Sequence, residues 1–184
     1  MRFSYNWLKE LIAFTVSPKQ LAELLTLYSF ETVIAGRVSG DWAIEARIPA
    51  NRVSDAASHW GLTAEIAAIG SYRLRRNPAA SRRLPKPVSS SATPVEIRIT
   101  LPDACPRYSA QVLEFAGIRP APKLIQERLR TCGFRHISNV VDITNYVMLE
   151  TGQPLHAFDL DALRGGAMTI RESRRGENLT TLDG

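Results

Sequence analysis

The 184-residue chain is 45% hydrophobic and 22% charged, which predicts one or two globular domains with a real core. No run reaches the roughly 18 uncharged apolar residues of a membrane span, and the charged Lys9 and Glu10 stand where a secretion signal needs its apolar segment. Cys105 and Cys132 form neither a CxxC pair nor a zinc-type cluster, so we expect a reduced, cytoplasmic protein without a metal site.

The predicted first domain, residues 1–70, is a small α+β domain. Ser17 followed by Pro18 is typical of a helix start, with serine as the N-cap. Gly36 and Gly40 mark the turn between two predicted strands. The spacing of apolar residues predicts helices at 4–12, 18–28 and 62–70, and strands at 30–38 and 42–48.

The net charge of +5 comes from one segment. Residues 1–70 carry a net charge of −1, residues 96–184 carry 0, and residues 71–95 carry +6. Prolines and serines are frequent in residues 71–94, which predicts a linker. Its cations could contact RNA phosphates, or the segment could be a solvated connector. The candidate RNA-contacting residues are Arg73, Arg75, Arg76, Arg82, Arg83 and Lys86.

Residues 95–184 are predicted to form a second, mixed α/β domain. One helix is opened by Pro122 and ended by Gly133. The next has Asn139 as its predicted N-cap and stops before Gly152. Strands are predicted at 95–99, 108–115 and 167–173, and a turn with a further strand is expected from residue 174 onward.

Thr144 falls in the middle of the apolar helix face formed by Val140, Val141, Val147 and Met148. A buried hydroxyl must find a partner or cost roughly 1–3 kcal/mol. One prediction is a bond back to the carbonyl of Val140, as threonine commonly makes in helices. The alternative is that this face borders a pocket and that the hydroxyl points into it.

His156 follows Pro154 just beyond the predicted helix. Alone, such a histidine is typically structural, but beside Thr144 and Asn145 it favours a pocket for a small polar ligand. No nucleophile is apparent, because Cys132 lies at a helix C-terminus, where the helix dipole raises a thiol pKa.

Residues 135–163, RHISNVVDITNYVMLETGQPLHAFDLDAL, strongly resemble the editing domain of the bacterial phenylalanyl-tRNA synthetase β subunit. The runs NVVDITNYVMLE and GQPLHAFD are highly specific to that family. Further segments similar to the family lie at 3–10, 17–31, 48–69 and 104–113.

The resemblance implies a ligase β subunit that supports aminoacylation of tRNA-Phe and hydrolytic editing of mischarged Tyr-tRNA-Phe. Thr144, Asn145 and His156 match residues of the editing pocket, and Asn139 matches a nearby lining position. The implied partners are the catalytic α subunit and tRNA-Phe, with no DNA and no membrane. ATP and Mg²⁺ are implied for the α subunit, and no cofactor for this chain.

Three departures from the family stand out. The oligonucleotide-binding barrel that most members insert near residues 36–48 is missing, and Ala64 replaces a usual arginine. The final Asp183-Gly184 is a hairpin-turn signal, so we expect the chain to stop midway through the editing domain and to be inactive alone. Two alternatives remain open, a stand-alone tRNA-binding or editing module and a non-catalytic subunit-interaction domain.

Overall fold

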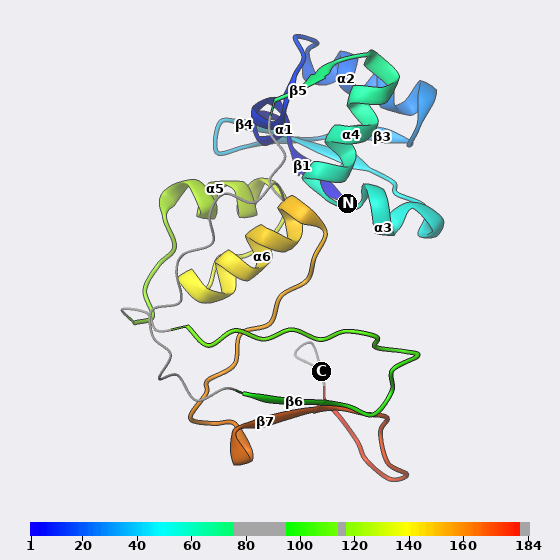
Figure 1. The fold of residues 1–184 in the computed structure, drawn as a ribbon. Helices are drawn as coiled ribbons and strands as arrows, with labels where there is room; N and C mark the ends of the chain where they lie inside the picture. Colours follow the sequence, from blue (N-terminus) through cyan, green and yellow to red (C-terminus); the bar gives the residue numbers. More distant parts are fainter. Residues whose placement is uncertain (76–94, 114–116, 181–184) are drawn as a thin grey trace. The chain divides into compact units, whose positions relative to one another are not determined.

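A computed structural model describes residues 1–75, 95–113 and 117–180. The chain forms two compact units, one of Met1–Leu84 with Gly117–Ala157 and one of Pro85–Ala116 with Phe158–Gly184 (Figure 1). The predicted α+β class is confirmed. The compact units divide the chain differently from the predicted domains, because residues 117–157 pack with the N-terminal residues.

A three-stranded antiparallel sheet in the order β1-β4-β3 organises the first unit. The strands are β1 (Arg2–Ser4), β3 (Thr32–Val38) and β4 (Asp41–Ala46). Ser39 and Gly40, with φ of 51° and 83°, form the tight turn between β3 and β4, where a turn was predicted. Gly36 lies at a bulge in β3 instead of the turn, since the pairing shifts between Ile34 and Gly36.

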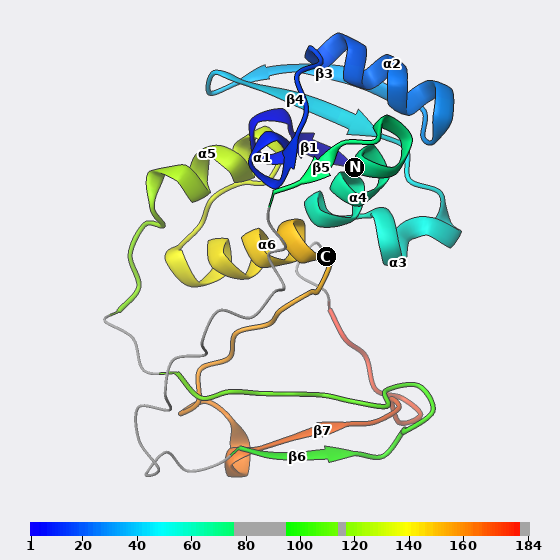
Figure 2. The same ribbon diagram turned by 45° about the horizontal axis from the view of Figure 1, so that its top comes forward.

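Helices pack around this sheet, and α2 lies against β3 (Figures 1 and 2). Ser17 caps α2 with a complete capping box and Pro18 is its first residue, as predicted. Ser58 caps α4, which therefore starts three residues earlier than the predicted 62. The helical segments of this region are α1 (Tyr5–Leu11), α2 (Pro18–Tyr28), η1 (Ala50–Arg52), α3 (Val53–Ala56) and α4 (His59–Gly70).

The main core lies between the sheet and these helices. Phe3 and Ile44 from the sheet and Leu8, Leu25 and Leu62 from the helices are all fully buried. At about 25 cal/mol per Å² of apolar surface, each such side chain contributes about 1.5–3 kcal/mol to folding.

Gly61 stands where α4 touches the backbone of α3. A Cβ there would lie 2.0 Å from the Asp55 carbonyl oxygen and 2.9 Å from the Ala56 Cα. Gly61→Ala is therefore expected to lower the free energy of unfolding by about 2 kcal/mol, measured by urea denaturation. Gly70→Ala provides the comparison, because the three atoms nearest to its Cβ would belong to the Tyr72 side chain and not to backbone, so its loss should be smaller.

The start of the predicted linker is part of the fold. β5 (Arg73–Leu74) pairs antiparallel with β2 (Ile12–Ala13). Arg73 and Arg75 therefore belong to the first unit. The other predicted RNA-contacting residues, Arg76, Arg82, Arg83 and Lys86, lie outside the described residues.

Two further helices, α5 (Lys123–Thr131) and α6 (Asn139–Thr151), lie side by side in the first unit. Pro122 precedes α5, and Gly133 follows it with φ of 85°, as predicted. The predicted N-cap of α6 was wrong by one residue. Ser138 Oγ accepts the Val141 N–H, because Ser138 is extended while Asn139 is already helical.

The second unit contains the parallel pair β6 (Glu96–Ile99) and β7 (Ala167–Ile170), with a short helix η2 (Arg164–Gly166) before β7. The predicted strand at 108–115 was wrong for residues 108–113, which pair with no strand in the described part of the chain. Residues 174–180 likewise form no strand there, and residues 181–184 lie outside it. Within the described ranges, no helix is long and apolar enough to cross a membrane.

Candidate functional site on helix α6

An aromatic stack positions α6 against the N-terminal helices. The Trp7 ring on α1 lies between Tyr146 of α6, with centroids 4.4 Å apart, and His59 of α4, with centroids 4.0 Å apart. Both pairs are close to parallel, at 23° and 26°. Leu129 of α5 and Leu149 of α6 complete this second core. The stack therefore joins three helices that are far apart in sequence.

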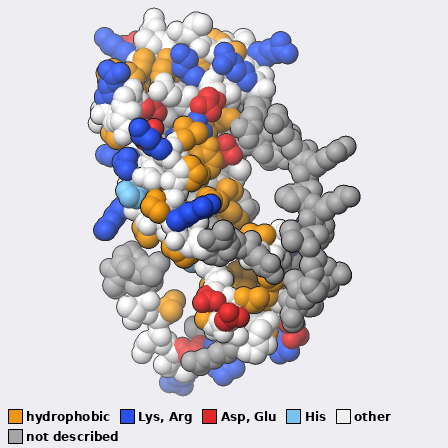
Figure 3. Space-filling view, turned by 90° about the vertical axis from the view of Figure 1, so that its left-hand side faces the viewer, with side chains coloured by type: hydrophobic (Ala, Val, Ile, Leu, Met, Phe, Trp, Pro, Cys, Tyr) orange, Lys and Arg blue, Asp and Glu red, His pale blue; other side chains and the backbone are white. Residues whose placement is uncertain are grey.

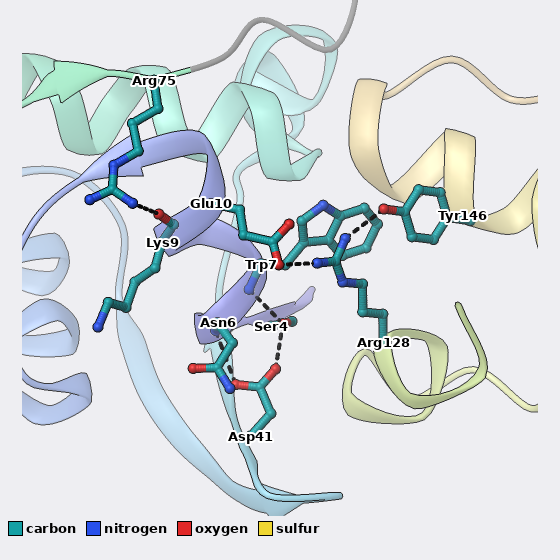
Figure 4. Close-up of polar contacts among 9 residues, drawn as sticks. All are labelled: Ser4, Asn6, Trp7, Lys9, Glu10, Asp41, Arg75, Arg128 and Tyr146. Atoms are coloured by element: carbon teal, nitrogen blue, oxygen red, sulfur yellow. Dashed lines mark hydrogen bonds and ion pairs between the residues drawn. The ribbon is translucent and has the colours of Figure 1, made fainter. Parts of the chain in front are cut away.

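Arg128 of α5 fixes one side of the stack (Figure 4). Its guanidinium donates to the Tyr146 hydroxyl at 2.6 Å, forms an ion pair with Glu10 and lies 4.9 Å from the centre of the Trp7 ring. Only 7% of Arg128 is exposed. One buried cation thus ties α1, α5 and α6 together.

His59 fixes the other side of the stack and is fully buried. Its Nε2 accepts the Ser4 N–H at 3.0 Å, so the ring proton lies on Nδ1, which donates to the Leu149 carbonyl at 2.9 Å. Burial lowers the pKa of His59 to about 3, against the opposing effect of the Leu149 carbonyl and with a smaller contribution from the charge of Arg128. His59 is therefore neutral and structural near pH 7.

The face of α6 that packs inward is not the predicted apolar face. Asp142 and Leu149 are 0% and 1% exposed, whereas Val141 remains 37% exposed. Asp142 can be buried because its Oδ1 accepts the Ile137 N–H at 2.8 Å, although its Oδ2 has no partner in the described residues. Val141 and Ile143 of α6 are therefore exposed, and hydrophobic side chains lie among charged ones on the face of the molecule in Figure 3.

Thr144 and Asn145 lie half-buried on α6. Thr144 Oγ1 donates to the carbonyl of Val141 at 2.8 Å, so the predicted bond to Val140 was wrong by one residue. Because that bond uses the hydroxyl proton, the Thr144 oxygen keeps lone pairs that can accept a hydrogen bond. The Asn145 side chain makes no hydrogen bond within the described part of the chain, so its amide keeps both donor and acceptor capacity.

Asn139 and His156 lie near the two ends of this region. Asn139 Oδ1 accepts the Arg119 N–H at 3.2 Å and its Nδ2 donates to the Gly117 carbonyl at 3.2 Å, so this side chain holds the loop before α5. His156 is exposed. The chain turns at Gly152, which ends α6 with φ of 84°.

The predicted site residues share one unit, and two hollows lie elsewhere in it. A hollow of about 340 Å³ lies at the C-terminal end of α6, between Met1, Phe134, Met148 and Pro154. A shallow one of about 770 Å³ lies between α2 and β3. Neither is lined by Thr144, Asn145, His156 or Asn139.

Cys132 offers no nucleophile to this region. Burial is the main cause that raises the pKa of its thiol, to about 12, so the thiol is neutral at pH 7. The direction matches the sequence-based expectation, although burial and not the helix dipole dominates. Across residues 1–75, 95–113 and 117–180, no group of three His, Cys, Asp or Glu side chains could hold a metal ion.

Sequence reasoning missed Arg128, Tyr146 and His59, which hold α6 in place. Their partners lie 118, 18 and 90 residues away along the chain. Of these residues, only Tyr146 lay in a predicted helix with an aromatic ring that could stack, so the sequence contained little signal for the cluster.

Residues 104–184 match the sequence profile of the B3/4 domain, so the chain carries a domain of this class. The chain is 45% identical to the phenylalanine–tRNA ligase beta subunit of Anaeromyxobacter dehalogenans over 78% of its own length and 18% of the relative's. It is 35% identical to that of Rhodopirellula baltica over 100% of its length and 26% of the relative's.

The chain belongs to the phenylalanine–tRNA ligase beta subunit family. It spans 18% to 26% of the lengths of these two relatives.

Proposed function

We propose that this chain is part of a phenylalanine–tRNA ligase beta subunit that supports charging of tRNA-Phe and removes tyrosine from mischarged tRNA-Phe. The observation that carries the ligase role is 35–45% identity to beta subunits over 78–100% of the chain. As such a subunit it partners an alpha subunit and tRNA-Phe. ATP and Mg²⁺ bind, in this proposal, to the alpha subunit, where they supply the activation of phenylalanine.

The editing role rests on the surface of α6. Tyrosine differs from phenylalanine by one hydroxyl, and a site that pairs with this hydroxyl discriminates strongly, because phenylalanine leaves its polar groups unpaired. The Thr144 oxygen is an available acceptor, and the Asn145 amide is both donor and acceptor. Asn139 supports this surface of α6 by holding the loop at Gly117 and Arg119 in place.

Hydrolysis in this proposal uses a positioned water. The water attacks the ester carbonyl, and the bond from that carbon to the ribose oxygen breaks, releasing tyrosine and restoring the ribose hydroxyl. Exposed His156 contacts the ribose, the water or the ester carbonyl as it approaches α6. This route needs no enzyme nucleophile, consistent with a neutral, buried Cys132 thiol.

Replacing His156 with alanine tests the editing role. In the full-length protein that carries this chain, assembled with its alpha subunit, His156→Ala should slow tyrosine release from Tyr-tRNA-Phe by about 100-fold. Gln153→Ala, an exposed neighbour, should release tyrosine at the unaltered rate. Phenylalanine charging should survive in both variants.

Equal rates for His156→Ala and the unaltered assembly would remove His156 from the mechanism. If the unaltered assembly released tyrosine from Tyr-tRNA-Phe no faster than spontaneous hydrolysis, the editing role would be wrong. The 184-residue chain alone is expected not to release tyrosine, and release by it would favour a stand-alone editing module.

A further inference from the structure

The cations of residues 1–75 fall into two groups. Four form ion pairs with carboxylates at 2.7–3.9 Å. Lys9, Arg37, Arg73 and Arg75 are exposed and have no carboxylate partner in the described residues, although Lys9 lies over the Tyr5 ring and Arg37 over the Trp42 ring. The paired cations are Arg2, Lys19, Arg47 and Arg52. Three of the four unpaired cations, Lys9, Arg73 and Arg75, lie close together in the fold.

The backbone holds these three residues together. Arg73 pairs with Ala13, and the Arg75 N–H donates to the Leu11 carbonyl at 2.7 Å. Arg75 Nη1 also donates to the Lys9 carbonyl at 3.1 Å, which brings its guanidinium beside α1 (Figure 4). Arg75 directly follows β5, and its two bonds to α1 keep it next to Arg73 at the end of the β2–β5 pair.

This pairing changes what the segment can offer to an RNA. A flexible linker cannot hold its cations in a fixed arrangement, whereas a strand paired to β2 can. The chain then continues through residues 76–94, which contain four more cations and no acidic residue. The positive charge at the surface is therefore not offset by the next segment of sequence.

We propose that Lys9, Arg73 and Arg75 form a surface that contacts the sugar–phosphate backbone of RNA without reading its sequence. Guanidinium groups bind phosphate oxygens through paired hydrogen bonds, and neutralised phosphates release counterions, which drives binding at moderate salt. This inference rests on the proposed function in taking tRNA as the partner.

The test compares two triple variants that lose the same charge. K9Q/R73Q/R75Q removes three cations that have no carboxylate partner among the described residues, and R2Q/K19Q/R47Q removes three cations held in exposed ion pairs. Affinity of the 184-residue chain for labelled tRNA-Phe is measured by fluorescence anisotropy across a salt series. The first variant should bind about 10-fold more weakly and lower the slope of log affinity against log salt by about 2. The second should change affinity by less than about 3-fold.

Equal weakening by both variants would show that only net charge matters and overturn the proposal. An unaltered chain that fails to bind tRNA would also overturn the proposal. If K9Q/R73Q/R75Q lost binding to polyglutamate but kept its tRNA affinity, the surface would be assigned to an acidic protein instead. K9R/R73K/R75K keeps the charge and should keep the salt slope. Retained tRNA affinity without tyrosine release would count against the editing role but leave this surface in place.

Discussion

Arg128→Ala is expected to lower the free energy of unfolding of the first unit by about 3 kcal/mol. The ion pair with Glu10 contributes little of this, because the Glu10 side chain is 56% exposed and solvent screens it. Most of the loss comes from the charged hydrogen bond to the Tyr146 hydroxyl, worth about 1.5–3 kcal/mol, and from the guanidinium stacked on Trp7. Urea denaturation followed by tryptophan fluorescence measures the change.

Arg130→Ala is the matched control on the same helix. Arg130 is exposed and bonds only to the Gln126 side chain, at 3.1 Å, so its removal should cost within about 0.5 kcal/mol. Tyr146→Phe completes a double-mutant cycle with Arg128→Ala and should show a coupling of about 1–2 kcal/mol. Equal losses in Arg128→Ala and Arg130→Ala would mean that the stack does not hold α6 in place.

Features encoded within a few residues could be predicted from the sequence. Ser17 and Pro18 start α2 because a serine cap and a proline at the first helical position satisfy local geometry. Gly133 and Gly152 follow α5 and α6 with positive φ, which glycine adopts without strain. The strands on either side of Gly40 were predicted for the same local reason.

The buried face of α6 could not be predicted in this way. A helical wheel finds the apolar stripe around Thr144. It does not show the Ile137 amide that donates to Asp142 Oδ1, or the Ser4 and Leu149 groups bonded to His59. Those partners are brought together by packing between distant segments. The wheel therefore located the helix correctly and assigned its inner face wrongly.

At the candidate site, too, the sequence located the residues but did not show their contacts with distant segments. The family motif located Thr144, Asn145 and His156 on or just after α6, and periodicity suggested a back-bond for Thr144, found one residue away at Val141. Neither source showed that Asn139 holds the loop before α5. Composition also made Arg73 part of a linker, because a two-residue strand has no periodicity of its own.

Acid should destabilise the first unit through His59. The unfolded histidine takes up a proton near pH 6.5, whereas the folded one does so only near pH 3. Between these values the unfolded state binds more protons, so the stabilisation is complete above about pH 6.5 and is lost as the pH falls. The contribution of His59 to the free energy of unfolding should fall by about 2 kcal/mol from pH 7 to pH 5, and by about 3 kcal/mol to pH 4.

Urea denaturation at each pH measures this slope, and two histidine variants isolate it. His59→Gln should be less stable at pH 7 but should lack the part of the slope that His59 supplies. His136→Gln alters an exposed histidine and should keep the slope of the unaltered chain. An imidazole NMR titration gives an independent reading, since protonation of His59 near pH 6.5 in the folded chain would contradict the prediction. The ring stays neutral mainly because burial disfavours its charged form, and a proton on Nε2 would also break the contact with the Ser4 N–H that joins β1 to α4.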